Sequence, residues 1–145
     1  MQTILVPVDF SETSEYALDY AIRFAKELHA RVHVLHSYEI PAVGLPEGAM
    51  VMTADIAGRI MTSSKAALEA TVTQRKDSGV ELLSTLRSGD PRVSIGEVAK
   101  EISADLIVMG THGRRGVVHF LLGSITEYVV RTSDIPVLTV RHPSK

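Results

Sequence analysis

Two short, uninterrupted apolar runs constrain the fold of this chain more than any other feature: Ile4 to Val6 and Leu106 to Met109. Neither run alternates between apolar and polar residues, so both sides of each segment are expected to be covered. The first run ends at Pro7-Val8-Asp9, and the second breaks into Gly110-Thr111-His112-Gly113. We therefore predict two strands of a parallel sheet that carries helices on both faces.

Helical and strand patterns alternate along the rest of the chain. Apolar residues at helical spacing predict four helices: Ser11 to His29, Ala54 to about Lys76 with Gly79 as the C-cap, the segment from Asp90-Pro91 to Ile102, and Ser124 to Thr132. Three further strands are predicted at Val32 to Leu35, Val80 to Leu86 and Pro136 to Val140. The segment from Tyr38 to Thr53 contains prolines and glycines without a sustained period, which predicts a long loop and a candidate lid at residues 39–53.

This alternation predicts a single α/β domain over residues 1–145. With right-handed crossovers, the expected architecture is a three-layer, doubly wound, five-stranded parallel sheet of strand order 3-2-1-4-5. The strand order then reverses between the first and fourth strands, and ligands bind at the carboxyl ends of the strands that flank such a point. Asp9 and Gly110 are therefore expected to lie beside each other in a binding site.

Composition excludes several classes of function. The formal net charge of -2 gives no broad cationic surface, so we expect no nucleic-acid partner. The chain contains no cysteine, which excludes disulfides, thiolate chemistry and cysteine-bound metals. No apolar run approaches the length of about 18 residues that a membrane helix needs, and the N-terminus has no charged leader. We expect a cytoplasmic protein that does not insert into a membrane.

The segment from Gly110 to Thr126 has the order strand, glycine loop, helix start, which suits phosphate binding by backbone N–H groups. Glycines at 110, 113, 116 and 123 are expected to take positive φ and to let a ligand approach the backbone. The N–H groups of Ser124, Ile125 and Thr126 open the helix, and the hydroxyls of Ser124 and Thr126 offer further hydrogen bonds to phosphate or a bound divalent ion. Arg114 and Arg115 offer counter-charge.

Each of these features also has a purely structural interpretation. Ser124 to Glu127 reads Ser-x-x-Glu, so Ser124 is a candidate N-cap of the helix through the N–H of Glu127. A glycine-rich loop after a strand is equally compatible with a structural turn. Arg114 and Arg115, taken alone, are compatible with solvated surface positions. Asp9 is placed to accept hydrogen bonds from a ribose hydroxyl or an adenine amino group, or to cap the entry to the first helix.

Catalytic and metal-binding patterns are missing from the sequence. There is no Gly-x-x-x-x-Gly-Lys-Ser/Thr and no Gly-x-Gly-x-x-Gly, which argues against motor-type NTPases and dinucleotide dehydrogenases. His29, His33 and His142 are expected at the surface. His36 and His112 fall near the predicted site without a serine or cysteine nucleophile. We predict no catalytic residue and no metal held by protein side chains. A phospho-receiver domain needs a phosphorylatable aspartate after the third strand, where this chain has Arg87, so that class is excluded.

Five segments together resemble the universal stress protein family: Pro7-Val8-Asp9-Phe10-Ser11, Leu35-His36-Ser37, Leu106 to Gly113, Gly123-Ser124-Ile125-Thr126-Glu127, and Ile135 to Val140. The resemblance covers nearly the whole chain and implies an adenine nucleotide alpha hydrolase-like fold. In that family, Gly-x-x-Gly followed by nine residues and Gly-Ser/Thr characterises the ATP-binding branch. Here the pattern is matched at Gly110, Gly113, Gly123 and Ser124.

The resemblance implies a complete set of nucleotide contacts. The adenosine part would lie at Pro7, Val8 and Asp9, with the backbone near Ser37 at the adenine edge and with Met109 and Gly110 beside the ribose. The phosphates would be held at Gly113, Arg114, Gly123, Ser124, Ile125 and Thr126, with Mg²⁺ bound through the phosphates. Ser37 departs from the family pattern, because an apolar residue is common at that position. ATP is the expected ligand, with ADP and AMP as alternatives.

The final predicted strand, residues 136–140, is expected at an edge of the sheet, where its unpaired backbone groups could bind a second copy of the chain. Members of the family commonly form dimers through this strand, and dimers could pair into tetramers. The leading hypothesis is a nucleotide-responsive dimeric stress or signalling module with a protein partner that the sequence does not identify. The alternatives are a slow ATPase and an interaction scaffold that needs no nucleotide.

Overall fold

The computed structural model describes residues 1–41, 50–111 and 122–143, without the side chains of residues 50–53. Its core is one five-stranded parallel sheet of strand order β3-β2-β1-β4-β5, as predicted. The strands are β1 (Thr3–Pro7), β2 (Arg31–Tyr38), β3 (Leu82–Ser88), β4 (Leu106–Gly110) and β5 (Val137–Val140). β5 therefore lies at one edge of the sheet, which confirms its predicted position.

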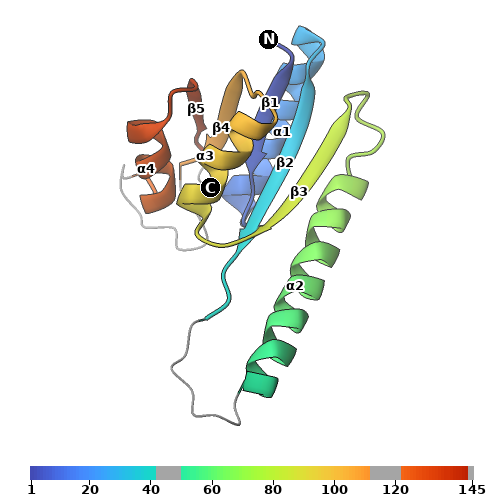
Figure 1. Ribbon diagram of the computed structural model, residues 1–145. Coiled ribbons are helices and arrows are strands. Elements are labelled where there is room, and N and C mark those ends of the chain that lie inside the picture. The colour runs from blue at the N-terminus through green and yellow to red at the C-terminus, as the bar shows by residue number, and fades with distance from the viewer. Residues whose placement is uncertain (42–49, 112–121, 144–145) are drawn as a thin grey trace.

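In the described part of the chain, four helices cover the two faces of this sheet (Figure 1). They are α1 (Glu12–Leu28), α2 (Met50–Thr73), α3 (Pro91–Glu101) and α4 (Ser124–Thr132). Buried side chains of α1 and α2 belong to the hydrophobic core on one face, and those of α3 and α4 to the core on the other. The three-layer architecture follows from this division.

The apolar run of β1 is divided between the two cores. Ile4 and Val6 pack into the core beside α1, while Leu5 packs into the core beside α3 and α4, and all three side chains are 0% exposed. Successive residues of a strand point to opposite faces, so a strand covered on both faces needs apolar residues throughout. The uninterrupted run of Ile4 to Val6 thus has a direct structural reason.

α2 differs from its prediction at both ends. It begins at Met50, inside the predicted loop, and its regular part ends at Thr73, before a turn that leads to Gly79 at φ +81°. Its N-terminal half extends beyond the carboxyl ends of β2 and β3 (Figure 1), and Ile56 and Met61 there are 46% and 48% exposed. The predicted apolar stripe is therefore buried only towards the C-terminal half of the helix, where Leu68 is 4% exposed.

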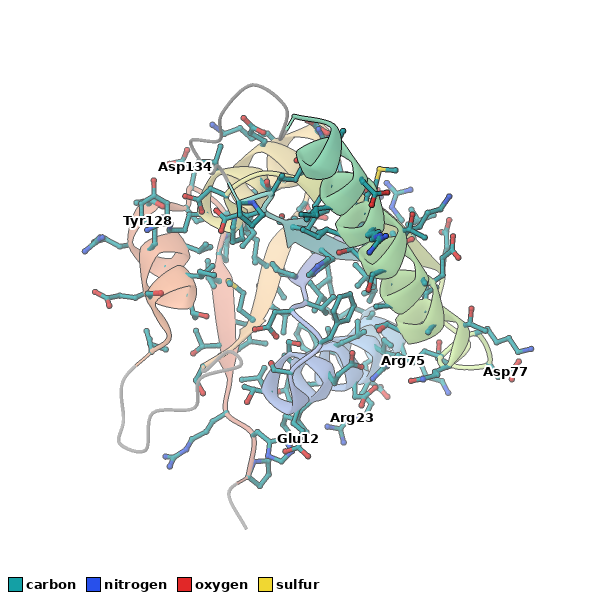
Figure 2. The ribbon with its side chains drawn as sticks, turned by 90° about the horizontal axis from the view of Figure 1, so that it is seen from below. Glu12, Arg23, Arg75, Asp77, Tyr128 and Asp134 are labelled. Atoms are coloured by element: carbon teal, nitrogen blue, oxygen red, sulfur yellow. The ribbon has the colours of Figure 1, made fainter. Side chains whose placement is uncertain are left out.

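Arg75 fixes the C-terminal end of α2 to α1 (Figure 2). Its guanidinium lies 2.7 Å from a carboxylate oxygen of Glu15 and 2.6 Å from one of Asp19. The Arg75 side chain is largely buried, whereas Asp19 remains more than half exposed. The contact positions the end of α2 that follows the buried side chains of Leu68 and Thr71.

His33 lies inside the sheet, so the prediction that it is a surface residue is wrong. It is 9% exposed, and its Nε2 atom lies 2.6 Å from the hydroxyl oxygen of Thr85 on β3. β2 is an inner strand between β1 and β3, and both of its faces are largely covered. Burial lowers the pKa of His33, and the positive charge of Arg31 lowers it further.

Candidate functional site

A cavity of about 320 Å³ lies at the carboxyl ends of β1 and β4, where the strand order of the sheet reverses. This volume falls within the range of about 300 to 1,000 Å³ of typical small-molecule sites. Ten predicted site residues line it: Pro7, Val8, Asp9, Ser37, Met109, Gly110, Gly123, Ser124, Ile125 and Thr126. The topology therefore brings together residues that are more than one hundred positions apart in the sequence.

Four lining residues had not been predicted: Ser14, Leu35, Pro91 and Ile95. Pro91 opens α3, which follows the carboxyl end of β3, so it reaches the same edge of the sheet as the predicted residues. That position could have been inferred from the topology. Leu35 and Ile95 look like ordinary core residues in the sequence, and both are 1% exposed. Together they make the side of the cavity towards β2 and α3 apolar.

Asp9 lies on the cavity wall and also shapes the turn that leads into α1. Its Oδ1 atom accepts hydrogen bonds from the backbone N–H of Ser11 at 3.0 Å and from the Ser11 hydroxyl. The backbone N–H of Asp9 donates to the hydroxyl oxygen of Ser14 at 3.2 Å. The structural interpretation of Asp9 is therefore correct, and it is compatible with a ligand contact because Asp9 faces the cavity as well.

The turn after β1 is held by an aromatic contact. Phe10 adopts a left-handed backbone conformation with φ 64°, which is uncommon for a residue with a bulky side chain. Its ring lies 4.3 Å from that of His36, whose Nδ1 atom is 2.8 Å from the carbonyl oxygen of Val8. Since a carbonyl can only accept, Nδ1 is the protonated nitrogen and donates this bond. The contact fixes the backbone on both sides of Asp9.

The N-terminus of α4 presents three unbonded backbone donors. Its N-cap is Gly123, which makes no side-chain capping bond, and the N–H of Glu127 donates to the Gly123 carbonyl at 2.8 Å. The capping-box interpretation of Ser124 is therefore wrong. In the described part of the chain, the N–H groups of Ser124, Ile125 and Thr126 have no acceptor. Such donors, together with the helix dipole, favour an anion.

Two hydrogen bonds connect the start of α4 to the end of β4. The Thr126 hydroxyl donates to the carbonyl oxygen of Gly110 at 2.9 Å, and the N–H of Gly123 donates to the carbonyl oxygen of Thr111 at 2.6 Å. A hydroxyl has a single proton to donate, so Thr126 offers a phosphate its backbone N–H rather than its side chain. The end of β4 and the start of α4, which both line the cavity, are thereby held at a fixed spacing.

Gly110 is required by close packing rather than by a left-handed conformation. A Cβ atom at this position would lie 2.6 Å from Cγ2 of Thr13 and 3.0 Å from the Thr13 carbonyl oxygen. Gly110 does not have a left-handed φ, and Gly123 has φ -57°. The expectation of positive φ at these two glycines is therefore wrong, whereas Gly113 and Gly116 lie outside the described residues. α1 crosses the end of β4 too closely for any side chain there.

Ser37 carries the one buried side-chain polar atom without a hydrogen-bond partner among the described residues. Buried hydroxyls are nearly always bonded, so this oxygen fits a site that is completed by a polar ligand.

The predicted phosphate residues Gly113 and Arg114 lie outside the described residues. No three described His, Cys, Asp or Glu side chains are grouped as a metal site. None of the described helices is long and apolar enough to cross a membrane.

Comparison with known proteins gives a consistent family. The model of the universal stress protein family matches residues 1–141. A related protein, universal stress protein MJ0531 from Methanocaldococcus jannaschii, is 35% identical over 144 residues, which cover 98% of this chain and 83% of the relative. The similarity thus extends over almost the entire chain.

Solved structures share the fold. Protein MJ0577 from Methanocaldococcus jannaschii superimposes with a TM-score of 0.85 at 28% identity, over 99% of this chain and 98% of the other. The universal stress protein from Archaeoglobus fulgidus in complex with dAMP has a TM-score of 0.65 at 25% identity, over 96% and 97% of the two chains. An adenine nucleotide is therefore bound by a protein of this architecture.

Proposed function

The chain belongs to the universal stress protein family, and from this premise we propose that it binds ATP between β1, β4 and α4 as a nucleotide-responsive, dimeric module in stress signalling. The observation that carries the proposal is the set of three unbonded N–H groups of Ser124, Ile125 and Thr126 on the wall of a ligand-sized cavity. These donors suit a phosphate chain. The apolar opposite side, with Leu35 and Ile95, suits a purine base.

The proposed binding mode assigns each part of the nucleotide to one part of the cavity wall. The base lies towards β2 and α3, Asp9 accepts hydrogen bonds from the ribose hydroxyls, and Met109 and Gly110 flank the sugar. The phosphates lie at the N-terminus of α4, with Gly113 and Arg114 completing the phosphate site and Mg²⁺ bound through the phosphate oxygens. The complex of the Archaeoglobus fulgidus protein with dAMP supports an adenine nucleotide as the class of ligand. ADP and AMP would share the same base and ribose contacts.

Calorimetric titration with ATP tests the binding, and Gly123→Asp is the most informative variant. Gly123 has φ -57° and ψ 150°, which an aspartate adopts without strain, and aspartate is a preferred N-cap. Its carboxylate would accept hydrogen bonds from the free N–H groups and repel phosphate, so we expect a stable protein that no longer binds ATP. Absence of binding by the unchanged protein would refute the proposal.

Gly96→Asp is the matched control, because it adds the same charge elsewhere. Gly96 lies on α3, where a Cβ atom would have no heavy atom within 4 Å, and it is not part of the cavity wall. We expect this variant to bind ATP like the unchanged protein. Release of phosphate above background, abolished by Gly123→Asp alone, would favour a slow ATPase over a pure binding module.

The proposed dimer forms through the outer edge of β5, the last strand of the sheet. The carbonyls of Pro136 and Val140 accept hydrogen bonds from Ile107 and Thr111, so the backbone groups of Thr139, which alternate with them, point away from β4. Thr139→Pro removes the outward N–H and preserves the bonds to β4. Light scattering should give a dimer mass for the unchanged protein and a monomer mass for this variant. A tetramer mass would indicate that dimers pair.

A further inference from the structure

The hydroxyl of Ser37 is enclosed in the protein without a hydrogen-bond partner among the described residues. A serine hydroxyl both donates and accepts, and leaving both functions unused in the interior is unfavourable. Ser37 lies in β2, away from the helix termini and turns where serine hydroxyls commonly bond the local backbone. The hydroxyl is therefore a candidate for a contact that forms only when a ligand is present.

Ser37 belongs to the apolar side of the cavity. It follows Leu35 by two residues in β2, so the two side chains point to the same face of the sheet, and both line the cavity. Ile95 and Pro91 contribute the lining from α3. The other polar side chains of the wall come from the β1–α1 turn, from the first turn of α1 and from α4. Among the described lining residues from β2 and α3, Ser37 is the one with a polar side chain.

The backbone around Ser37 is also open towards the cavity. β1 ends at Pro7, which is paired with Leu35, and the N–H of Val8 donates to the Leu35 carbonyl at 2.8 Å. Strand pairing with β1 therefore stops two residues before Ser37. A planar ring can approach Ser37 from the side on which β1 has ended.

We propose that the Ser37 hydroxyl oxygen accepts a hydrogen bond from the exocyclic amino group of adenine and thereby makes the site selective for that base. This inference rests on the proposed ATP binding. The amino group is the only hydrogen-bond donor on the adenine base, and the Ser37 hydroxyl is the side-chain acceptor among the described lining residues of β2 and α3. Serine has a single side-chain torsion, so its hydroxyl can turn to the ligand between staggered positions.

The test compares ATP with purine riboside triphosphate, which lacks only the amino group, in binding to the unchanged protein and to Ser37→Ala. We expect Ser37→Ala to weaken ATP about 3- to 10-fold and to leave the analogue nearly unaffected. The ratio of the two affinities would fall by the same factor. AMP should lose as much affinity as ATP, since the contact does not involve the phosphates.

Ser133→Ala is the matched control, because the Ser133 hydroxyl is bonded to the backbone of Ile135 and lies outside this cavity. It should lower the melting temperature and leave the affinity ratio unchanged, whereas Ser37→Ala removes an unbonded hydroxyl and should not lower it. An unchanged affinity ratio in Ser37→Ala, with ATP still bound, would overturn this inference alone. Failure of the unchanged protein to bind ATP would overturn the proposed function as well.

Discussion

The Thr126 hydroxyl donates a hydrogen bond of 2.9 Å to the carbonyl oxygen of Gly110, across fifteen intervening residues of the chain. Thr126 belongs to the first turn of α4 and is 6% exposed, and Gly110 is the last residue of β4. The bond therefore fixes the N–H donors at the N-terminus of α4 relative to the carboxyl end of β4. The shape of the candidate site depends on it.

Replacing Thr126 by valine tests this role. Valine has nearly the same shape but cannot donate, so the Gly110 carbonyl would lose its partner in the interior. We expect a loss of about 1 to 2 kcal/mol in the free energy of unfolding, measured in urea, and weaker ATP binding. Thr126→Ser keeps the hydroxyl and should retain ATP affinity. Equal ATP affinities of the two variants would contradict the role of the bond.

Gly110→Ala should destabilise the protein because the added methyl group has no space. Its Cβ would lie 2.6 Å from Cγ2 of Thr13 and 3.0 Å from the Thr13 carbonyl oxygen, so α1 or β4 must move. Overpacking of this kind costs about 1 to 3 kcal/mol. Gly96→Ala, in the open on α3, should instead stabilise the protein by roughly 0.5 to 1 kcal/mol. Denaturation curves that show no difference between the two variants would refute the packing explanation.

His33 should make the stability of the protein depend on pH. Burial and the charge of Arg31 hold the pKa of His33 below its ordinary value of 6.5, so the folded state binds fewer protons than the unfolded state in mildly acidic solution. Its contribution to stability is complete above pH 6.5 and is lost as the pH falls below that value. His33→Gln should flatten the curve of unfolding free energy between neutral and mildly acidic pH. A curve that stays as steep in His33→Gln as in the unchanged protein would contradict this explanation.

Asp105 should stabilise the folded state at every pH except strongly acidic pH. Hydrogen bonds from the backbone N–H of Gln2 at 2.7 Å and of Thr3 at 3.0 Å hold the pKa of Asp105 below 3.8. The carboxylate then stabilises the folded state above pH 3.8, and this contribution disappears as the pH falls through the lowered pKa. Asp105→Ala should therefore be less stable than the unchanged protein at neutral pH, and the difference should shrink below pH 3.8. A difference that stays constant with pH would contradict this.

Features that depend on local pattern were predictable from the sequence. Continuous apolar runs such as Ile4 to Val6 predicted covered parallel strands, and the alternation of strands with helices predicted the strand order and the meeting of Asp9 with Gly110. The first residue of α4 also agrees with its prediction.

Features that depend on contacts between distant elements were not predictable. The packing of α1 at Thr13 explains Gly110, whereas the sequence suggested a conformational reason. The pairing of His33 with Thr85 depends on how β2 and β3 align. One local pattern also misled: Ser124 matches a capping box, but the N-cap of α4 is Gly123, so Ser124 is already the first helical residue and the expected side-chain bond does not form.

The position of the nucleotide is tested by titrating isotope-labelled protein with ATP and following the amide resonances in NMR spectra. If ATP binds at the carboxyl ends of β1 and β4, the largest shifts should occur at the amides of Ser124, Ile125 and Thr126, with further shifts at Asp9 and Ser37. Amides around Arg75, which is not part of the cavity wall, should remain in place. Shifts centred on that region, or no shifts at saturating ATP, would show that ATP does not bind at the carboxyl ends of β1 and β4.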